Sequence, residues 1–252
     1  GQYNGKDASL GRLVPTKAAD VAWRRDPDEP VMQRTLFVPY EKNGMRQLDA
    51  VAGASGIDLF YLGLDSKQEP ALCHATGDLS GRQWKRTGAV LLATNGVPRP
   101  TVSEPNGKLP GNVVFFTVAR DSDRWVFLLA LETGGKLEVW PAAGESLSSV
   151  KLGPAALIPS GKILGNLAAL DGKFQDGRWT ADLATATGIT RFSQQADGAL
   201  LETRPVDWKV EGCVITGLRS DKAGDASVIG YRRSWTNSTG QQVSSAEIMA
   251  GT

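Results

Sequence analysis

The sequence predicts an all-β fold, with a single β-propeller of about five or six blades as first choice and a β-sandwich or two-sheet β domain as the alternative. Helical periodicity is poor, and only residues 16–23 and 163–170 are helix candidates longer than a turn or two. The 29 glycines and 13 prolines divide the remainder into short runs. Trp84 to Trp125, and Trp140 to Trp179, are each separated by about 40 residues, which is typical of propeller blades.

The first predicted group of strands lies between residues 57 and 92. Residues 57–64, 70–76 and 84–92 are rich in β-branched, aromatic and aliphatic side chains. The polar turn DSKQE at 65–69 and the loop GDLSGRQ at 77–83 separate them. Short polar connections between apolar runs predict a three-stranded antiparallel meander.

A second meander is predicted between residues 112 and 142. Its three strands are NVVFFTVAR at 112–120, RWVFLLALE at 124–132 and KLEVWPA at 136–142. The turns DSD and TGG between them are short and polar.

Because 252 residues with 41% hydrophobic content can bury one sizeable core, we expect a single β-rich domain over residues 1–252.

The charge of the chain and the length of its apolar runs argue against nucleic-acid binding and against a transmembrane helix. The 28 basic and 27 acidic residues leave a formal net charge of +1, and no stretch concentrates the basic residues, so a nucleic-acid groove is not expected. The longest apolar runs are far shorter than the roughly 20 residues that span a bilayer, so no transmembrane helix is predicted. The first residue is glycine, which fits a processed mature protein or a remnant of a removed tag.

The cysteines and the single histidine point to no cofactor. Cys73 and Cys213 fit one disulfide or two free thiols equally well. His74 follows Cys73 on a predicted strand, so the two side chains point to opposite faces and form no dyad. One histidine cannot build a histidine-rich metal site, and no phosphate-binding or dinucleotide fingerprint is present. We therefore expect neither metal nor cofactor, and we expect His74 to be a half-buried strand residue.

The loop that follows residues 70–76 resembles part of a known enzyme fold. The residues ATGDLSGRQWKRTGAVL resemble blades of five-bladed propeller glycoside hydrolases of the family 43 and family 32 type, in which a strand precedes a T-x-D-L-x-x-W turn. Thr76, Asp78, Leu79 and Trp84 match this turn in kind, with one extra residue before the tryptophan. The resemblance covers about one blade. We expect Asp78 to accept backbone N–H bonds in the turn and Trp84 to cover the blade edge.

The resemblance implies catalytic carboxylates around a central funnel. One carboxyl group of a glycoside hydrolase protonates the leaving oxygen while another activates water or attacks carbon. Asp26, in RRDPDEP, resembles the aspartate of the Asp-Pro that opens the first blade of family 43 enzymes and would be the base. Glu104, in VSEPNGK, would be the general acid, and Asp58 is the candidate for the third carboxylate.

Some aromatic and basic residues are candidates for ligand binding. Sugar rings stack on tryptophan, and their hydroxyl groups bond to polar side chains. Trp179 lies in KFQDGRWTADL, while Trp235 and Arg232 lie in GYRRSWTNSTGQQ. Arg232 and Arg233 are adjacent on a predicted strand, so at most one of them can line a given site.

Two functions from different classes follow from these patterns. In the first, the protein is an extracytoplasmic, secreted or periplasmic β-propeller that binds or hydrolyses a glycan, and is a possible glycoside hydrolase. In the second, it is a non-catalytic β module that binds another protein, such as an inhibitor, an immunity-type partner or an envelope component. Blade-like meanders favour the first function. The scarcity of clear catalytic motifs favours the second.

Overall fold

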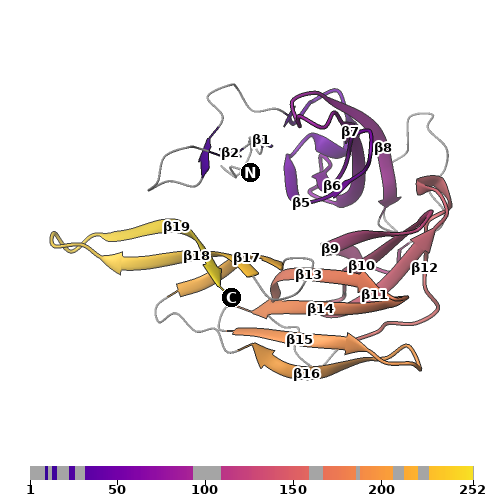
Figure 1. The fold of residues 1–252 in the computed structure, drawn as a ribbon. Coiled ribbons are helices and arrows are strands. Elements are labelled where there is room, and N and C mark those ends of the chain that lie inside the picture. Colours follow the sequence, from indigo (N-terminus) through magenta and orange to yellow (C-terminus); the bar gives the residue numbers. More distant parts are fainter. Residues whose placement is uncertain are drawn as a thin grey trace. The chain divides into compact units, whose positions relative to one another are not determined.

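The computed structural model describes residues 9–10, 13–15, 23–25, 32–92, 109–158, 167–185, 188–206, 213–220 and 227–251. These residues form antiparallel sheets and two short 3-10 helices (Figure 1). The chain divides into two compact units, of which unit 1 contains residues 1–113 and 144–151 and unit 2 contains residues 114–143 and 152–252. Among the described residues, the only helices are short 3-10 turns, and none is a candidate membrane span.

The first four-stranded sheet belongs to unit 1 and has the strand order β5-β6-β7-β8. Its strands are β5 (Met45–Ala52), β6 (Ile57–Leu64), β7 (Pro70–Gly77) and β8 (Trp84–Leu92). The three strands predicted between residues 57 and 92 are therefore confirmed. The strand β5 was not predicted, because it carries the polar run MRQLDAVA.

The loop between β7 and β8 has the predicted scaffold role. The Oδ1 atom of Asp78 accepts hydrogen bonds from the backbone N–H groups of Arg82 and Gln83, at 2.9 and 3.0 Å. The hydrogen bond from Ser80, followed by these backbone bonds, lowers the pKa of Asp78. Trp84 donates its indole N–H to the carbonyl of Gly81, and its ring lies so close to Gly77 that a Cβ there would clash. The expectation for Asp78 is confirmed, and the Trp84 ring covers Gly77 of β7.

The second four-stranded sheet has the strand order β12-β11-β10-β9. Its strands are β9 (Asn112–Asp121), β10 (Arg124–Thr133), β11 (Lys136–Gly144) and β12 (Lys151–Leu152), and the 3-10 helix η2 (Leu147–Ser149) precedes β12. The predicted second meander is therefore confirmed. Its tight turns contain Ser122 at φ 53° and two glycines with positive φ, which suits the short polar turn sequences.

The third four-stranded sheet lies in unit 2, and its first strand contains residues that were predicted to be helical. It has the order β13-β14-β15-β16, with β13 (Leu167–Gln175), β14 (Arg178–Thr185), β15 (Gly188–Gln194) and β16 (Leu200–Val206). Residues 163–170 were predicted as a helix candidate, but residues 167–170 open β13. The helix prediction is therefore wrong, because pairing with β14 overrides the local periodicity. The other helix candidate, 16–23, lies outside the described residues except for Trp23 in β3.

The tryptophan spacing does not measure a blade repeat. Trp84 lies on the fourth strand of its sheet and Trp140 on the third, whereas Trp125 and Trp179 each lie on the second. The four side chains therefore occupy unequal positions, and their spacing of about 40 residues is coincidental. The number of blades stays a prediction.

The remaining elements are a three-stranded sheet and several short strands. The sheet has the order β17-β18-β19, with β17 (Cys213–Ser220), β18 (Ser227–Thr236) and β19 (Gln242–Gly251). The short strands β1 (Ser9–Leu10) and β4 (Met32–Gln33) pair with each other, as do β2 (Leu13–Pro15) and β3 (Trp23–Arg25). The 3-10 helix η1 (Pro39–Glu41) precedes β5.

The core of unit 2 lies between sheets. One face of the β13–β16 sheet packs through Leu170, Leu183 and Phe192 against Leu128 and Val139 of the second sheet. These side chains share a face because residues opposite each other in a ladder point the same way. The other face carries Ala169, Ala184 and Ile189, which pack against Ile215 of β17. Both faces of the third sheet are therefore covered.

Candidate functional site

The structure describes only part of the set of predicted site residues. Asp26 and Glu104 lie outside the described residues, and the side chain of Arg232 does as well, although its backbone belongs to β18. Trp179 is only 3% exposed and packs edge-on against Phe174 in the core of unit 2. Trp235 is 43% exposed on β18. Asp58, on β6, is the one predicted carboxylate whose surroundings can be described.

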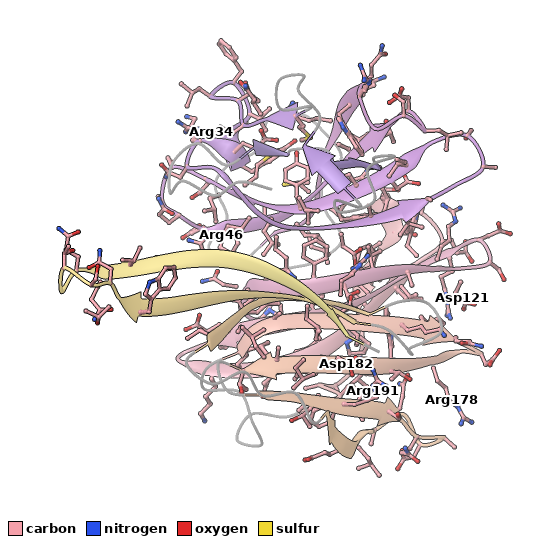
Figure 2. The ribbon with its side chains drawn as sticks, turned by 60° about the vertical axis from the view of Figure 1, so that its left-hand side comes forward. Arg34, Arg46, Asp121, Arg178, Asp182 and Arg191 are labelled. Atoms are coloured by element: carbon pink, nitrogen blue, oxygen red, sulfur yellow. The ribbon has the colours of Figure 1, made fainter. Side chains whose placement is uncertain are left out.

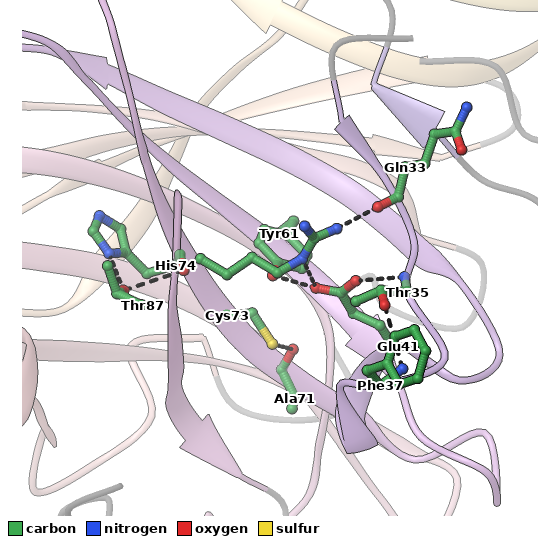
Figure 3. A network of polar contacts seen from close by, with 10 residues as sticks. Gln33, Thr35, Phe37, Glu41, Tyr61, Ala71, Cys73, His74 and Thr87 are labelled. Carbon is green, nitrogen blue, oxygen red and sulfur yellow. Dashed lines mark hydrogen bonds and ion pairs between the residues drawn. The ribbon is translucent and has the colours of Figure 1, made fainter. Parts of the chain in front are cut away.

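Asp58 begins a chain of hydrogen bonds across three strands of the first sheet. Its Oδ1 atom lies 2.8 Å from Nε2 of His74 on β7, and Nδ1 of His74 lies 2.6 Å from Oγ1 of Thr87 on β8. The His74–Thr87 end of this chain is visible in Figure 3. The imidazole is buried, with 4% of its side chain exposed, whereas the side chain of Asp58 is 28% exposed. The accessible end of the chain is therefore the carboxylate.

Burial sets the protonation state of His74. Removal from water lowers its pKa, and this effect exceeds the opposing influence of the hydrogen bond and charge of Asp58. Neutral His74 satisfies both partners when Nε2–H donates to Asp58 and the Thr87 hydroxyl donates to Nδ1. His74 was predicted to be half-buried, and the structure corrects this, because the whole residue is only 3% exposed.

The lowered pKa of His74 predicts a pH-dependent stability. In the unfolded chain this histidine binds a proton as the pH falls through about 6.5, whereas folded His74 binds it only at lower pH. Its contribution to stability is therefore present above pH 6.5 and is lost as the pH falls toward the folded pKa. We expect urea midpoints measured between pH 7.5 and 5.5 to decline in the wild type.

The control for this pH dependence is the His74→Phe variant, which removes the only histidine of the chain. Its urea midpoints should decline less over the same pH range. Equal slopes for the two proteins would contradict a lowered histidine pKa.

A second carboxylate, Asp49, lies on the same face of the first sheet. Asp49 is opposite Phe60 in the β5–β6 ladder, and Phe60 is opposite His74 in the β6–β7 ladder, so all three side chains share a face. Asp49 is 3% exposed, although β5 is otherwise exposed or half-buried. Its Oδ1 atom accepts a 2.6 Å hydrogen bond from the backbone N–H of Ala50. Asp49 was not predicted as a site residue because β5 was not predicted as a strand.

The backbone beside Asp49 is irregular. The register shifts between Arg46 and Leu48, and Gln47, between them, has a φ of 32°, in a region that side chains other than glycine rarely adopt. An extra residue of this kind bends the strand and turns the side chains that follow it. The bulge therefore sets the face to which Asp49 points. Such irregularities cluster at functional sites, which makes this strand a candidate wall of one.

Asp49 and Asp58 are suited to acid–base chemistry by their placement. Asp58 lies opposite Val51, two residues from Asp49 along β5, so the two aspartates are diagonal neighbours. Diagonal neighbours on adjacent strands lie roughly 7–8 Å apart, and their Cβ atoms are somewhat closer. Carboxyl pairs of glycoside hydrolases are separated by about 5 to 9.5 Å. This face of the first sheet, with Asp49, Asp58, His74 and Thr87, is hereafter called the carboxylate face.

The opposite face of the same sheet carries a scaffold network (Figure 3). Glu41 is fully buried, and its Oε1 atom accepts hydrogen bonds from the Tyr61 hydroxyl at 2.6 Å and from Nε of Arg86 at 2.7 Å. Its Oε2 atom accepts the backbone N–H of Thr35 at 3.1 Å, and Arg86 also donates to the carbonyl of Gln33. Burial, followed by Cys73 and Glu41, raises the pKa of Tyr61. Both oxygens of Glu41 are used for structure, so this carboxylate is not a site candidate.

Cys73 lies on the same face as this network. It is a free thiol with no exposed surface, and its Sγ atom lies 3.3 Å from the carbonyl of Ala71. Burial raises its pKa, so the thiol stays protonated and unreactive.

Unit 2 contains two more buried carboxylates. Asp171 and Asp182 are opposite each other in the β13–β14 ladder and are 4% and 5% exposed. Arg191 binds Asp182 through two parallel hydrogen bonds of 2.7 and 2.8 Å, and Arg219 of β17 lies 3.1 Å from Asp171. Figure 2 shows Asp182 beside Arg191 on the third sheet. Because each aspartate has an arginine partner, this group ties the β13–β16 sheet to β17.

The described residues contain no group of three or more histidine, cysteine, aspartate or glutamate side chains placed to hold a metal ion. The carboxyl groups of the carboxylate face can carry out proton transfer and nucleophilic attack.

Comparisons with solved structures place the fold among glycoside hydrolases. The family 117 glycoside hydrolase Zg3597 of the marine bacterium Zobellia galactanivorans has a TM-score of 0.62 at 7% identity, over 90% of this chain and 66% of its own. A variant of fructan 1-exohydrolase IIa from Cichorium intybus, in complex with 1-kestose, has a TM-score of 0.58 at 11% identity, over 94% and 48%. A thermostable family-43 glycoside hydrolase has a TM-score of 0.54 at 8% identity, over 84% and 72%.

These similarities concern the fold alone, because all three identities are low. The structures are β-propeller enzymes, so the resemblance inferred from residues 75–91 is confirmed, and the chain has an all-β fold like theirs. The chain spans about half the length of the fructan exohydrolase. No protein-family model matches the chain, and comparison with curated proteins gives no match.

Proposed function

We propose that the protein binds or hydrolyses a glycan, with the carboxylate face of the first sheet as part of the site. The observation that supports this most is the placement of Asp49 and Asp58 as diagonal neighbours on one face, within a fold similar to that of glycoside hydrolases. Asp58 accepts a hydrogen bond from His74, while Asp49 is buried beside a strand bulge. Two carboxyl groups in different surroundings are the minimum for glycoside cleavage.

The proposal also includes residues that were predicted from the sequence. Asp26 and Glu104 remain candidates for the base and the general acid. Trp235 and Arg232 remain candidates for ligand contacts, and the exposed indole of Trp235 can stack on a sugar ring. The burial of Trp179 gives it a packing role, so it is not carried forward. Location outside the cytoplasm also stays a prediction.

The first test is binding to a glycan array that includes fructosides such as 1-kestose, followed by a hydrolysis assay on each glycan bound. We expect Asp49→Asn and Asp58→Asn each to reduce turnover by about 100-fold or more, because an amide can neither supply nor accept the catalytic proton. Glu104→Gln should do the same with an almost unchanged Tm.

The matched control for these variants is Asp65→Asn. Asp65 is a buried carboxylate of the same unit, but it accepts the backbone N–H groups of Lys67 and Glu69 at the end of β6. This variant should lose some stability and keep its turnover. Full turnover in Asp49→Asn and Asp58→Asn would remove the carboxylate face from the mechanism. A blank glycan array would instead favour the second function, a protein-binding module, for which the 97% exposed Phe37 is the first surface residue to test.

A further inference from the structure

The donor and the acceptor can be assigned for each hydrogen bond of the chain on the carboxylate face. The Thr87 hydroxyl has one proton, and its oxygen lies within reach of both Nδ1 of His74, at 2.6 Å, and the backbone carbonyl of His74, at 3.2 Å. When the hydroxyl donates to Nδ1, the imidazole is neutral and carries its proton on Nε2. When it donates to the carbonyl instead, Nδ1 must donate to Oγ1, and the imidazole is charged if Nε2 also keeps its proton for Asp58. Burial of His74 favours the neutral arrangement.

Two carboxylates of the first sheet share a face with this imidazole. They are Asp58, which His74 contacts, and Asp49, which lies beyond Phe60 in the same cross-strand row. The Phe60 ring packs against the imidazole at 4.8 Å between centroids. Arg86 of β8 bonds to Glu41, and Cys73 lies among the core residues of the other face.

We propose that His74 is a positioning residue for Asp58: its Nε2–H holds Oδ1 of the carboxylate, so that Oδ2 is left to act on a glycan. Among the described residues, His74 is the side chain that hydrogen-bonds to this carboxylate. Thr87 in turn fixes the tautomer, because its hydroxyl occupies Nδ1 and leaves the proton on Nε2. The role in glycan chemistry rests on the proposed function, whereas the pairing of His74 with Asp58 does not.

The pairing can be measured without any glycan, because the chain has one histidine. In protein labelled with ¹⁵N-histidine, a pH titration by NMR follows this imidazole alone. We expect the Nε2–H tautomer at neutral pH and a histidine pKa below about 6.5. In Asp58→Asn the histidine pKa should fall further, because the carboxylate raises it. An Nδ1–H tautomer, or the same titration in both proteins, would overturn the inference.

The role in glycan chemistry is tested with two substitutions that differ in one hydrogen bond. His74→Phe keeps a ring in the space but cannot donate to Asp58, while Thr87 can still donate to the backbone carbonyl at 74. His74→Gln keeps an N–H donor. We expect His74→Phe to lower kcat by about tenfold, because the carboxylate loses the donor that orients it. His74→Gln should restore most of kcat.

The outcomes separate the two proposals. Equal loss in His74→Phe and His74→Gln, or no loss in either, would overturn the positioning role. If the wild type binds no glycan, the proposed function fails, and the NMR titration alone decides whether His74 holds Asp58.

Discussion

Replacing Arg86 with methionine is expected to lower the free energy of unfolding by about 3 kcal/mol or more. Glu41 is fully buried, and Arg86, with 24% of its side chain exposed, is its charged partner at 2.7 Å. Removing one member of a buried pair leaves an uncompensated charge in the interior and typically costs about 3–5 kcal/mol. The burial of Glu41 therefore places Arg86→Met among the most damaging single changes in unit 1.

The control for Arg86→Met is the same change at an exposed pair. Arg124 lies 2.9 Å from Asp121, and their side chains are 49% and 35% exposed. Exposed pairs of this kind contribute about 0–1 kcal/mol, so Arg124→Met should change little. Urea unfolding followed by tryptophan fluorescence compares the two variants. Similar small losses in both would show that the Glu41 network does not hold unit 1 together.

Replacing Gly63 with alanine is expected to destabilise the protein by about 1–3 kcal/mol. A Cβ at Gly63 would lie 2.2 Å from the backbone oxygen of Tyr40 and 3.2 Å from Sγ of Cys73. Real Cβ atoms do not approach this closely, so η1 must move away from β6. That movement would also disturb Glu41, the last residue of η1, together with its bonds to Tyr61 and Arg86.

The matched control is Gly188→Ala, at the start of β15. A Cβ there meets no atom within 4 Å, and Gly188 is not among the residues with positive φ. The added methyl group restricts the unfolded chain, so this variant should be unchanged or up to about 1 kcal/mol more stable. Differential scanning calorimetry should therefore give a lower Tm for Gly63→Ala and an equal or higher Tm for Gly188→Ala. An equally small change of Tm in both variants would mean that the segment around Tyr40 can move at little cost in stability.

The local sequence predicted strands where apolar residues form continuous runs between short polar turns. The strands β6 to β8 and β9 to β11 were predicted because runs such as IDLFYLGL and WVFLLAL are separated by short polar turns. The strand β5 was missed because MRQLDAVA contains one β-branched residue and no aromatic residue. Residues 163–170 looked helical because leucine and alanine recur at helical spacing, and only pairing with β14 makes residues 167–170 a strand.

The residues of the candidate site were also predicted only in part from the sequence. Asp58 was singled out by a resemblance to glycoside hydrolase blades, but nothing near it in the sequence pointed to His74, 16 residues away. The sequence placed Cys73 and His74 on opposite faces, which the structure confirms, because Cys73 packs with the core residues of the Glu41 side while His74 bonds to Asp58. Asp49 was not considered as a candidate because its strand, β5, was not predicted.

By itself, the sequence determined the all-β character, two meanders, the Asp78 turn and one carboxylate of the candidate site. These features depend on side-chain type and on neighbours close along the chain. Tertiary structure alone decided which side chains meet: strand register brings Asp49, Asp58 and His74 to one face, and burial lowers the pKa of His74. Register and burial depend on residues far apart in the chain, and a one-residue shift would send each of these side chains to the opposite face.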